Sequence, residues 1–123
     1  QLMNVPIEHA EGLPVLHYGP GQEYRAHYDF FNPNSPSARN NRISTLVIYL
    51  NDVEEGGETV FPMLDVAVKP KRGSAVYFEY FYRDQAINNL TLHSSIPVVR
   101  GEKWVATQWM RRQRIREIGS IPS

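Results

Sequence analysis

Short runs of apolar and β-branched residues alternate along the chain with clusters of Gly, Pro, Asn and Ser. The run 43–50 (ISTLVIYL) is almost continuously apolar, which is typical of a buried central strand. Similar shorter runs predict further strands over 13–18, 24–31, 59–61, 66–69, 74–82, 90–99 and 103–110. About eight short strands separated by turn residues are typical of an all-β sandwich or barrel. The pattern therefore predicts an all-β core, with a jelly-roll (double-stranded β-helix) as the best architecture.

Helical patterns are confined to the two ends of the chain. Residues 1–11 are interpreted as the tail of a helix that ends at Gly12, and 111–118 as a short basic helix. The chain divides into the tail of an N-terminal supporting segment (1–12), one β domain (13–112) and a C-terminal tail (113–123). It begins with Gln1 rather than Met, so we interpret it as the C-terminal portion of a longer protein.

Composition excludes several classes of function. Lys plus Arg (13) equal Asp plus Glu (13), so the formal net charge is zero, which argues against a nucleic-acid partner and a polybasic membrane anchor. No apolar run of about 18 residues occurs, so no transmembrane helix is predicted. The absence of Cys excludes disulfides and thiolate metal sites, so any metal must have N and O ligands. With no targeting signal in the sequence, a reducing, cytoplasmic location is the expectation.

His27 and Asp29 are the first candidates for chemistry. Residues two apart on a strand share a face, so this imidazole and carboxylate could ligate one ion, with His93 as a third ligand. Two His and one carboxylate form the facial triad of non-haem Fe(II) oxygenases. A structural His bonded to a nearby Asp is the alternative, and it is commoner for His-x-Asp alone. His9 and His17 are interpreted as surface or packing residues.

Lys103 follows His93 by ten residues and lies inside a predicted strand. Strand alternation places Lys103, Val105, Thr107 and Trp109 on one face. If that face is the apolar interior, the ammonium needs an anionic partner to offset the cost of burial. The alternative is the reverse parity, with Lys103 solvated at the end of a hairpin.

At this point the sequence resembles a known family. Over 13–112 it is similar to the C-terminal catalytic domain of prolyl 4-hydroxylases, particularly bacterial ones, a branch of the Fe(II)- and 2-oxoglutarate-dependent dioxygenases. The resemblance is carried, in order, by 27–31 (HYDFF), 42–53 (RISTLVIYLNDV), 56–62 (GGETVFP), 92–93 (LH) and 101–104 (GEKW). It implies that 13–112 is an Fe(II)/2-oxoglutarate dioxygenase domain, and that it lacks helices which brace the barrel in relatives.

The resemblance also implies roles for individual residues. His27, Asp29 and His93 would bind Fe(II), and Lys103 would pair with the distal carboxylate of 2-oxoglutarate. The co-substrate pocket would further include Tyr18, Thr59 and Trp109. Tyr24 and Arg42 match positions that contact peptide in relatives. L-Ascorbate would be the reductant, and a homodimer is an expectation from similar bacterial enzymes.

The predicted function is hydroxylation of peptidyl proline with O2, coupled to decarboxylation of 2-oxoglutarate to succinate and CO2. Two alternatives stay open. One is a related 2-oxoglutarate oxygenase that acts on free proline or on another amino-acid side chain. The other is a non-catalytic, cupin-like metal-binding module, against which the combination of His27, Asp29, His93 and Lys103 speaks.

Overall fold

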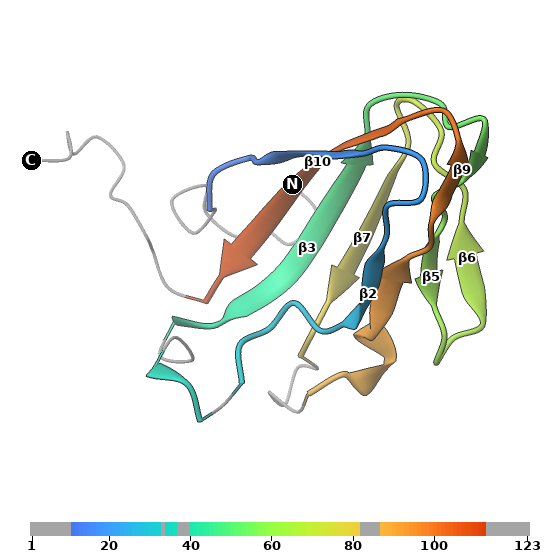
Figure 1. The fold of residues 1–123 in the computed structure, drawn as a ribbon. Helices are drawn as coiled ribbons and strands as arrows, with labels where there is room; N and C mark the ends of the chain where they lie inside the picture. The colour runs from blue at the N-terminus through green and yellow to red at the C-terminus, as the bar shows by residue number, and fades with distance from the viewer. Residues whose placement is uncertain (1–10, 33, 37–39, 82–86, 113–123) are drawn as a thin grey trace, which may run out of the picture.

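The long apolar run of the sequence forms β3 (Arg42–Tyr49), which lies inside one of two four-stranded antiparallel sheets (Figure 1). The computed structural model describes residues 11–32, 34–36, 40–81 and 87–112. The other strands of this first sheet are β1 (Val15–Tyr18), β10 (Lys103–Arg111) and β7 (Ala75–Glu79), in the order β1-β10-β3-β7. Long β3 and β10 pair in register from Val105 opposite Tyr49 to Met110 opposite Ser44, and so form the centre of the sheet.

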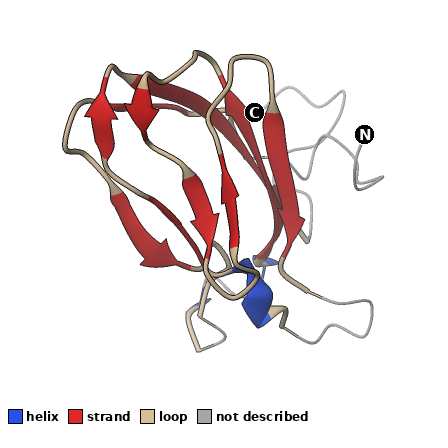
Figure 2. Cartoon of the chain, turned by 90° about the vertical axis from the view of Figure 1, so that its right-hand side faces the viewer, coloured by secondary structure: helices blue, strands red, loops and turns tan. Residues whose placement is uncertain are grey.

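The second sheet lies across from the first (Figure 2). Its strands are β2 (Tyr24–His27), β8 (His93–Ser95), β5 (Thr59–Phe61) and β6 (Val66–Val68), in the order β2-β8-β5-β6. A short ladder of β4 (Glu55–Gly56) with β9 (Val98–Arg100) adjoins it. Two sheets of short antiparallel strands confirm the predicted all-β jelly-roll core.

Aromatic residues fill part of the space between the sheets. Phe61 on β5, Phe78 on β7 and Tyr80 are all buried and form one cluster. Phe61 and Phe78 meet edge to face with ring centroids 5.1 Å apart, a favourable geometry for aromatic pairs. The cluster leaves the opposite part of the interior, around β1, β2 and β10, to the cavity described below.

Two predicted strands differ from the structure. β2 ends at His27, and Asp29 lies in a bend, because its carboxylate is bonded by donors of the first sheet. The prediction of one strand over 90–99 is wrong. That segment contains a 3-10 helix η3 (Asn89–Thr91), then β8, then β9 after Pro97, which has no N–H for a ladder.

The helical predictions at the chain ends fall almost entirely outside the described residues. This holds for 1–10 and 113–118, whereas Arg111 is the last residue of β10. The three-residue η3 is the one helix whose full span lies within the described residues. No helix in this part of the chain has the length and apolarity needed to cross a membrane.

Candidate functional site

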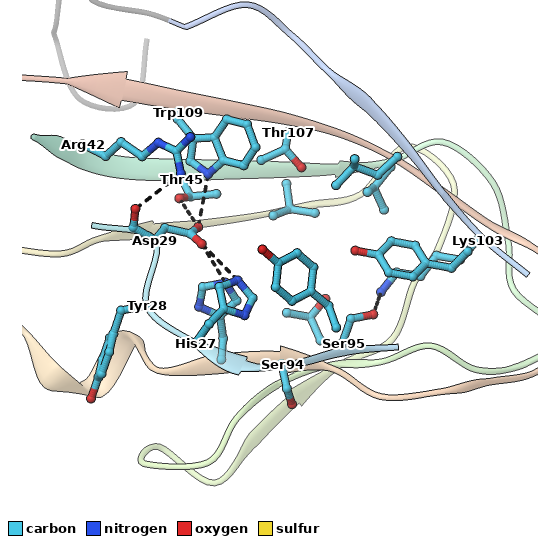
Figure 3. Close-up of a pocket in the computed structure, with 17 residues that line it drawn as sticks. His27, Tyr28, Asp29, Arg42, Thr45, Ser94, Ser95, Lys103, Thr107 and Trp109 are labelled. Atoms are coloured by element: carbon cyan, nitrogen blue, oxygen red, sulfur yellow. Dashed lines mark hydrogen bonds and ion pairs between the residues drawn. The ribbon is translucent and has the colours of Figure 1, made fainter. Parts of the chain in front are cut away.

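A cavity of about 250 Å³ opens between the two sheets (Figure 3). Its lining includes every candidate site residue predicted from the sequence, namely Tyr18, Tyr24, His27, Asp29, Arg42, Thr59, His93, Lys103 and Trp109. Strand alternation explains part of this convergence, because Lys103, Val105, Thr107 and Trp109 of β10 all line the cavity while Trp104 is 41% exposed. The prediction that Lys103, Val105, Thr107 and Trp109 share the interior face of β10 is therefore confirmed.

His27, Asp29 and His93 form a cluster at one end of the cavity. One ligand atom from each lies within 4.8 Å of the others. The two histidines are directly opposite each other on β2 and β8, with ring centroids 4.3 Å apart. Asp29 reaches them from the bend after β2. The sequence predicted this set, although it placed Asp29 on the strand itself.

Backbone carbonyls fix the orientation of both imidazole rings. Nδ1 of His27 is 2.7 Å from the carbonyl oxygen of Arg25, and Nδ1 of His93 is 2.7 Å from that of Thr91. A carbonyl only accepts, so in each ring Nδ1 carries the donated proton and Nε2 of the neutral ring keeps a lone pair. Both Nε2 atoms face Oδ1 of Asp29, at 3.1 and 3.5 Å.

Three electron-pair donors therefore converge on one point. Two imidazole nitrogens and a carboxylate oxygen suit a divalent transition-metal ion, and backbone bonds to the distal ring nitrogens are the usual support of such ligands. The donor set fits Fe(II) on chemistry alone. Without a cation, three acceptor atoms at these separations would repel one another unless a proton lies between them.

The hydrogen bonds around Asp29 keep it ionised. Burial alone would raise the pKa of its carboxyl group, but the hydrogen bond from Thr45 and the two imidazoles, which donate to Oδ1 when they are protonated, hold that pKa far below its usual value. Burial of the His27 ring works against protonation, yet Asp29 and the Arg25 carbonyl together raise the pKa of His27 above its ordinary value. The ionised Asp29 carboxylate attracts a cation, whereas a proton on Nε2 of His27 would compete with that cation.

Lys103 lies at the other end of the cavity, and its side chain is directed into the fold (Figure 3). The residue is only 2% exposed, and Nζ donates to the carbonyl of Gly57 and to Oγ of Ser95, both at 2.6 Å. Burial lowers the pKa of Lys103 to about 8, an effect that the charge of Glu58 partly offsets. The alternative of a solvated Lys103 is thus wrong.

Aromatic rings and hydroxyls surround this ammonium. Nζ of Lys103 lies 5.2 Å from the ring centroid of Tyr18 and 5.9 Å from that of Tyr49. Tyr49 and Thr59, both buried, share a 2.7 Å hydrogen bond between their hydroxyls. The end of the cavity at Lys103 thus combines a cation with hydroxyl groups, which is the chemistry that binds a carboxylate.

The remaining predicted residues lie near the cluster end. Nε1 of Trp109 donates to Oδ2 of Asp29 at 3.3 Å, so this indole borders the candidate metal ligands rather than Lys103. Tyr24 is 48% exposed and stacks on the His27 ring at 3.9 Å. Nε and Nη2 of Arg42 are bonded to the Glu11 carboxylate, and its guanidinium lies 4.1 Å over the Trp109 ring. Their roles toward ligands stay predictions.

Sequence reasoning missed four side chains that support the site. Ser95 binds Lys103, Tyr49 binds Thr59, and both Thr45 and Tyr80 bond to the Asp29 carboxylate. Strand alternation could have predicted the place of Ser95, because Ser95 lies two residues after His93 and shares its face of β8. Of the other histidines, His17 forms a surface pair with Glu102, with 3.0 Å between Nε2 and Oε1, and His9 lies outside the described residues.

Comparison with known proteins adds independent findings. Residues 13–111 match the family model of the 2OG-Fe(II) oxygenase superfamily. Probable prolyl 4-hydroxylase 9 from Arabidopsis thaliana is 39% identical over 125 residues, which is 89% of this chain and 43% of that protein. The chain therefore spans less than half the length of this curated relative.

Solved structures agree with this result. The viral collagen prolyl hydroxylase vCPH from Paramecium Bursaria Chlorella virus-1, in its 2OG complex, superposes with a TM-score of 0.78 at 38% identity, covering 85% of this chain and 60% of the viral one. A Pseudomonas putida prolyl-4-hydroxylase gives a TM-score of 0.61 at 28% identity, covering 82% and 52%.

Proposed function

Because the chain belongs to the 2OG-Fe(II) oxygenase superfamily, we propose that it is the catalytic part of a prolyl 4-hydroxylase. The reaction would hydroxylate a proline of a peptide at C4 with O2, while 2-oxoglutarate is converted to succinate and CO2. One observation carries this proposal: the three-ligand cluster and the buried Lys103 lie at opposite ends of one cavity. A dianionic co-substrate that chelates a metal at one end and ends in a carboxylate matches both.

His27, Asp29 and His93 would hold the ferrous ion. Neutral imidazoles and one carboxylate leave a net positive charge on a divalent ion, which favours an anionic co-substrate. Bound Fe(II) supplies the activation of O2, for which 2-oxoglutarate provides two electrons as it is decarboxylated. L-Ascorbate as reductant belongs to the same proposal.

Lys103 would anchor the distal carboxylate of 2-oxoglutarate. A charge-assisted hydrogen bond in a buried site is much stronger than a surface ion pair. Thr59 and Tyr18 line the same part of the cavity and would add hydroxyl donors. The anchor fixes the co-substrate so that its keto acid end reaches the metal ligands.

A proline-containing peptide would approach from the end of the cavity at Tyr24. The exposed Tyr24 ring stacked on His27, with Trp109 nearby, offers aromatic faces, which suit proline-rich extended segments. The related proteins named above are prolyl hydroxylases, which supports proline as the target. Arg42 also lines the cavity, with its guanidinium held against Trp109.

Mass spectrometry of defined peptides tests the proposal. The full-length protein is incubated with Fe(II), 2-oxoglutarate, ascorbate and collagen-like or other proline-rich peptides. We expect one added oxygen atom on proline, matched by succinate, and 4-hydroxyproline after acid hydrolysis. Asp29→Ala serves as the inactive control. Oxygen addition to free proline alone, or to another side chain alone, would overturn the assignment of substrate.

A further inference from the structure

The two oxygens of the Asp29 carboxylate have different surroundings (Figure 3). Oδ1 faces the imidazole nitrogens of His27 and His93. Oδ2 instead accepts hydrogen bonds from the first sheet. The donors are Thr45 Oγ1 at 2.7 Å, Trp109 Nε1 at 3.3 Å and the Tyr80 hydroxyl at 3.4 Å. The carboxylate is thus divided between a ligand oxygen and an oxygen occupied by the protein.

The protons of the two hydroxyls can be assigned from these contacts. Thr45 and Tyr80 are hydrogen-bonded to each other, and both are buried, at 1% and 0% exposure. A carboxylate only accepts, and each hydroxyl carries one proton. The shorter bond to Asp29 comes from Thr45, so Thr45 donates to Oδ2. The phenol of Tyr80 then donates mainly to Thr45 Oγ1.

We propose that Tyr80 and Thr45 are positioning residues, whose hydrogen-bond relay to Asp29 Oδ2 restricts this carboxylate to a single ligand oxygen. The inference rests on the proposed function, because it takes His27, Asp29 and His93 as the metal ligands. Carboxylates bind divalent ions through one oxygen or through both. An Oδ2 that is already engaged would leave Oδ1 as the oxygen that a bound ion meets.

Burial makes this relay effective. Neither hydroxyl can exchange its partner for bulk water, and hydrogen bonds in series polarise one another. Oδ2 stays occupied as long as β3, which carries Thr45, keeps its place in the first sheet. The ligand geometry on the second sheet is thus set by groups from the first sheet.

Thr45→Val removes the hydroxyl with little change in shape. Affinity is measured with Mn(II) alone, without 2-oxoglutarate or peptide, from the electron paramagnetic resonance of the free ion. Loss of such a supporting group typically weakens metal binding about 10- to 100-fold, and we expect a Kd increase in that range. Thr45→Ser, which keeps the hydroxyl, should restore the Kd to within a few-fold of the wild type. The visible spectrum of the Co(II) form should change in Thr45→Val because Oδ2 loses its shortest hydrogen bond.

A double-mutant cycle tests the relay itself. Tyr80→Phe should weaken Mn(II) binding less than Thr45→Val does, and it should add little to the effect of Thr45→Val, because the proton of Tyr80 acts through Thr45. Ser44→Ala is the matched control. Ser44 is the preceding residue on β3, is equally buried, points to the opposite face of the sheet and should leave the Kd unchanged.

The outcomes separate this inference from the proposed function. A wild-type protein that binds no Mn(II) would remove the metal site and the proposed function with it. If the wild type binds Mn(II) and both Thr45→Val and Tyr80→Phe keep its Kd, the relay is overturned while the metal site stands. If Thr45→Val does not fold, Tyr80→Phe and Thr45→Ser decide the question by the same measurement.

Discussion

Lys103 carries an ammonium into the interior, where both of its hydrogen-bond acceptors are neutral. Gly57 offers a carbonyl and Ser95 a hydroxyl, and within the described part of the chain no carboxylate is hydrogen-bonded to Nζ. This explains why burial lowers the pKa of Lys103 to about 8 even with Glu58 nearby. An incoming carboxylate would stabilise the protonated form, so binding of a dianionic co-substrate and protonation of Lys103 favour each other.

The affinity for 2-oxoglutarate should therefore depend on pH. The protonated amine binds the carboxylate, so the Kd should stay flat below pH 8 and rise as Lys103 loses its proton. With a pKa of about 8, the Kd should increase about tenfold between pH 7 and pH 9. Calorimetric titration of the Mn(II) form measures it. Lys103→Arg stays charged over this range, so a slope of equal size in that variant would contradict the assignment.

The same burial should cost stability in the absence of co-substrate. The folded-state pKa of Lys103 lies below that of the unfolded chain, so the unfolded chain binds the proton more tightly. The free energy of unfolding should then rise with pH from about 8 to 10, as Lys103 loses its proton. At pH 7 the protein bears the full cost of burying the charged side chain. Lys103→Met should stabilise the co-substrate-free protein at pH 7 by roughly 1–3 kcal/mol in urea unfolding, while it abolishes 2-oxoglutarate binding. A Lys103→Met variant that is less stable than the wild type at pH 7 would contradict the expected cost of burying Lys103.

At the scale of elements, the end of β4 at Gly56 positions Gly57, whose carbonyl accepts from Lys103. Gly56 has φ 83°, and a Cβ there would lie 2.4 Å from the Pro97 carbonyl oxygen. Gly56→Ala therefore combines left-handed strain with a backbone clash and should lower the free energy of unfolding by roughly 2–4 kcal/mol. Gly57 follows directly and its carbonyl accepts from Lys103, so a shift of the backbone here should also lower the affinity for 2-oxoglutarate.

Gly73→Ala is the matched control for Gly56→Ala. Gly73 has nearly the same φ, 82°, but a Cβ there would meet no atom within 4 Å. It should cost only the conformational strain, about 1 kcal/mol, and leave co-substrate affinity unchanged. Equal losses of stability in both variants, measured by urea unfolding, would show that the contact with Pro97 plays no part.

The elements differ in how far the sequence could predict them. β10 was predictable because nine residues of alternating pattern place Lys103 and Trp109 on one face. The bend at Asp29 was not, since it depends on bonds from Thr45, which lies 16 residues away on another sheet. The alternation of residues along a strand predicts which side chains share a face. The hydrogen bonds that support the site form only when the two sheets pack together.

At the scale of the whole molecule, the candidate metal site joins the two sheets. His27 and His93 belong to the second sheet, while Asp29 is bonded by Thr45 and Trp109 of the first. The resemblance to a known family pointed to the three candidate ligands, because His-x-Asp alone does not distinguish a ligand pair from a structural one. It could not show that the sheets depend on each other through Asp29, since this needs the relative positions of β2, β3 and β10.

A divalent cation should accordingly stabilise the whole fold. Its binding would relieve the repulsion among three converged acceptor atoms and link both sheets through Asp29. At Mn(II) concentrations 100 times the Kd, the folded state should gain about 2.7 kcal/mol, visible as a higher Tm that chelator reverses. Asp29→Ala should lose this response to Mn(II). His17→Ala should keep it, because His17 pairs with Glu102 at the surface. If Mn(II) does not change the Tm of the wild type, the cluster does not hold a cation. If Mn(II) raises the Tm of Asp29→Ala by the same amount as that of the wild type, the cation binds at another site.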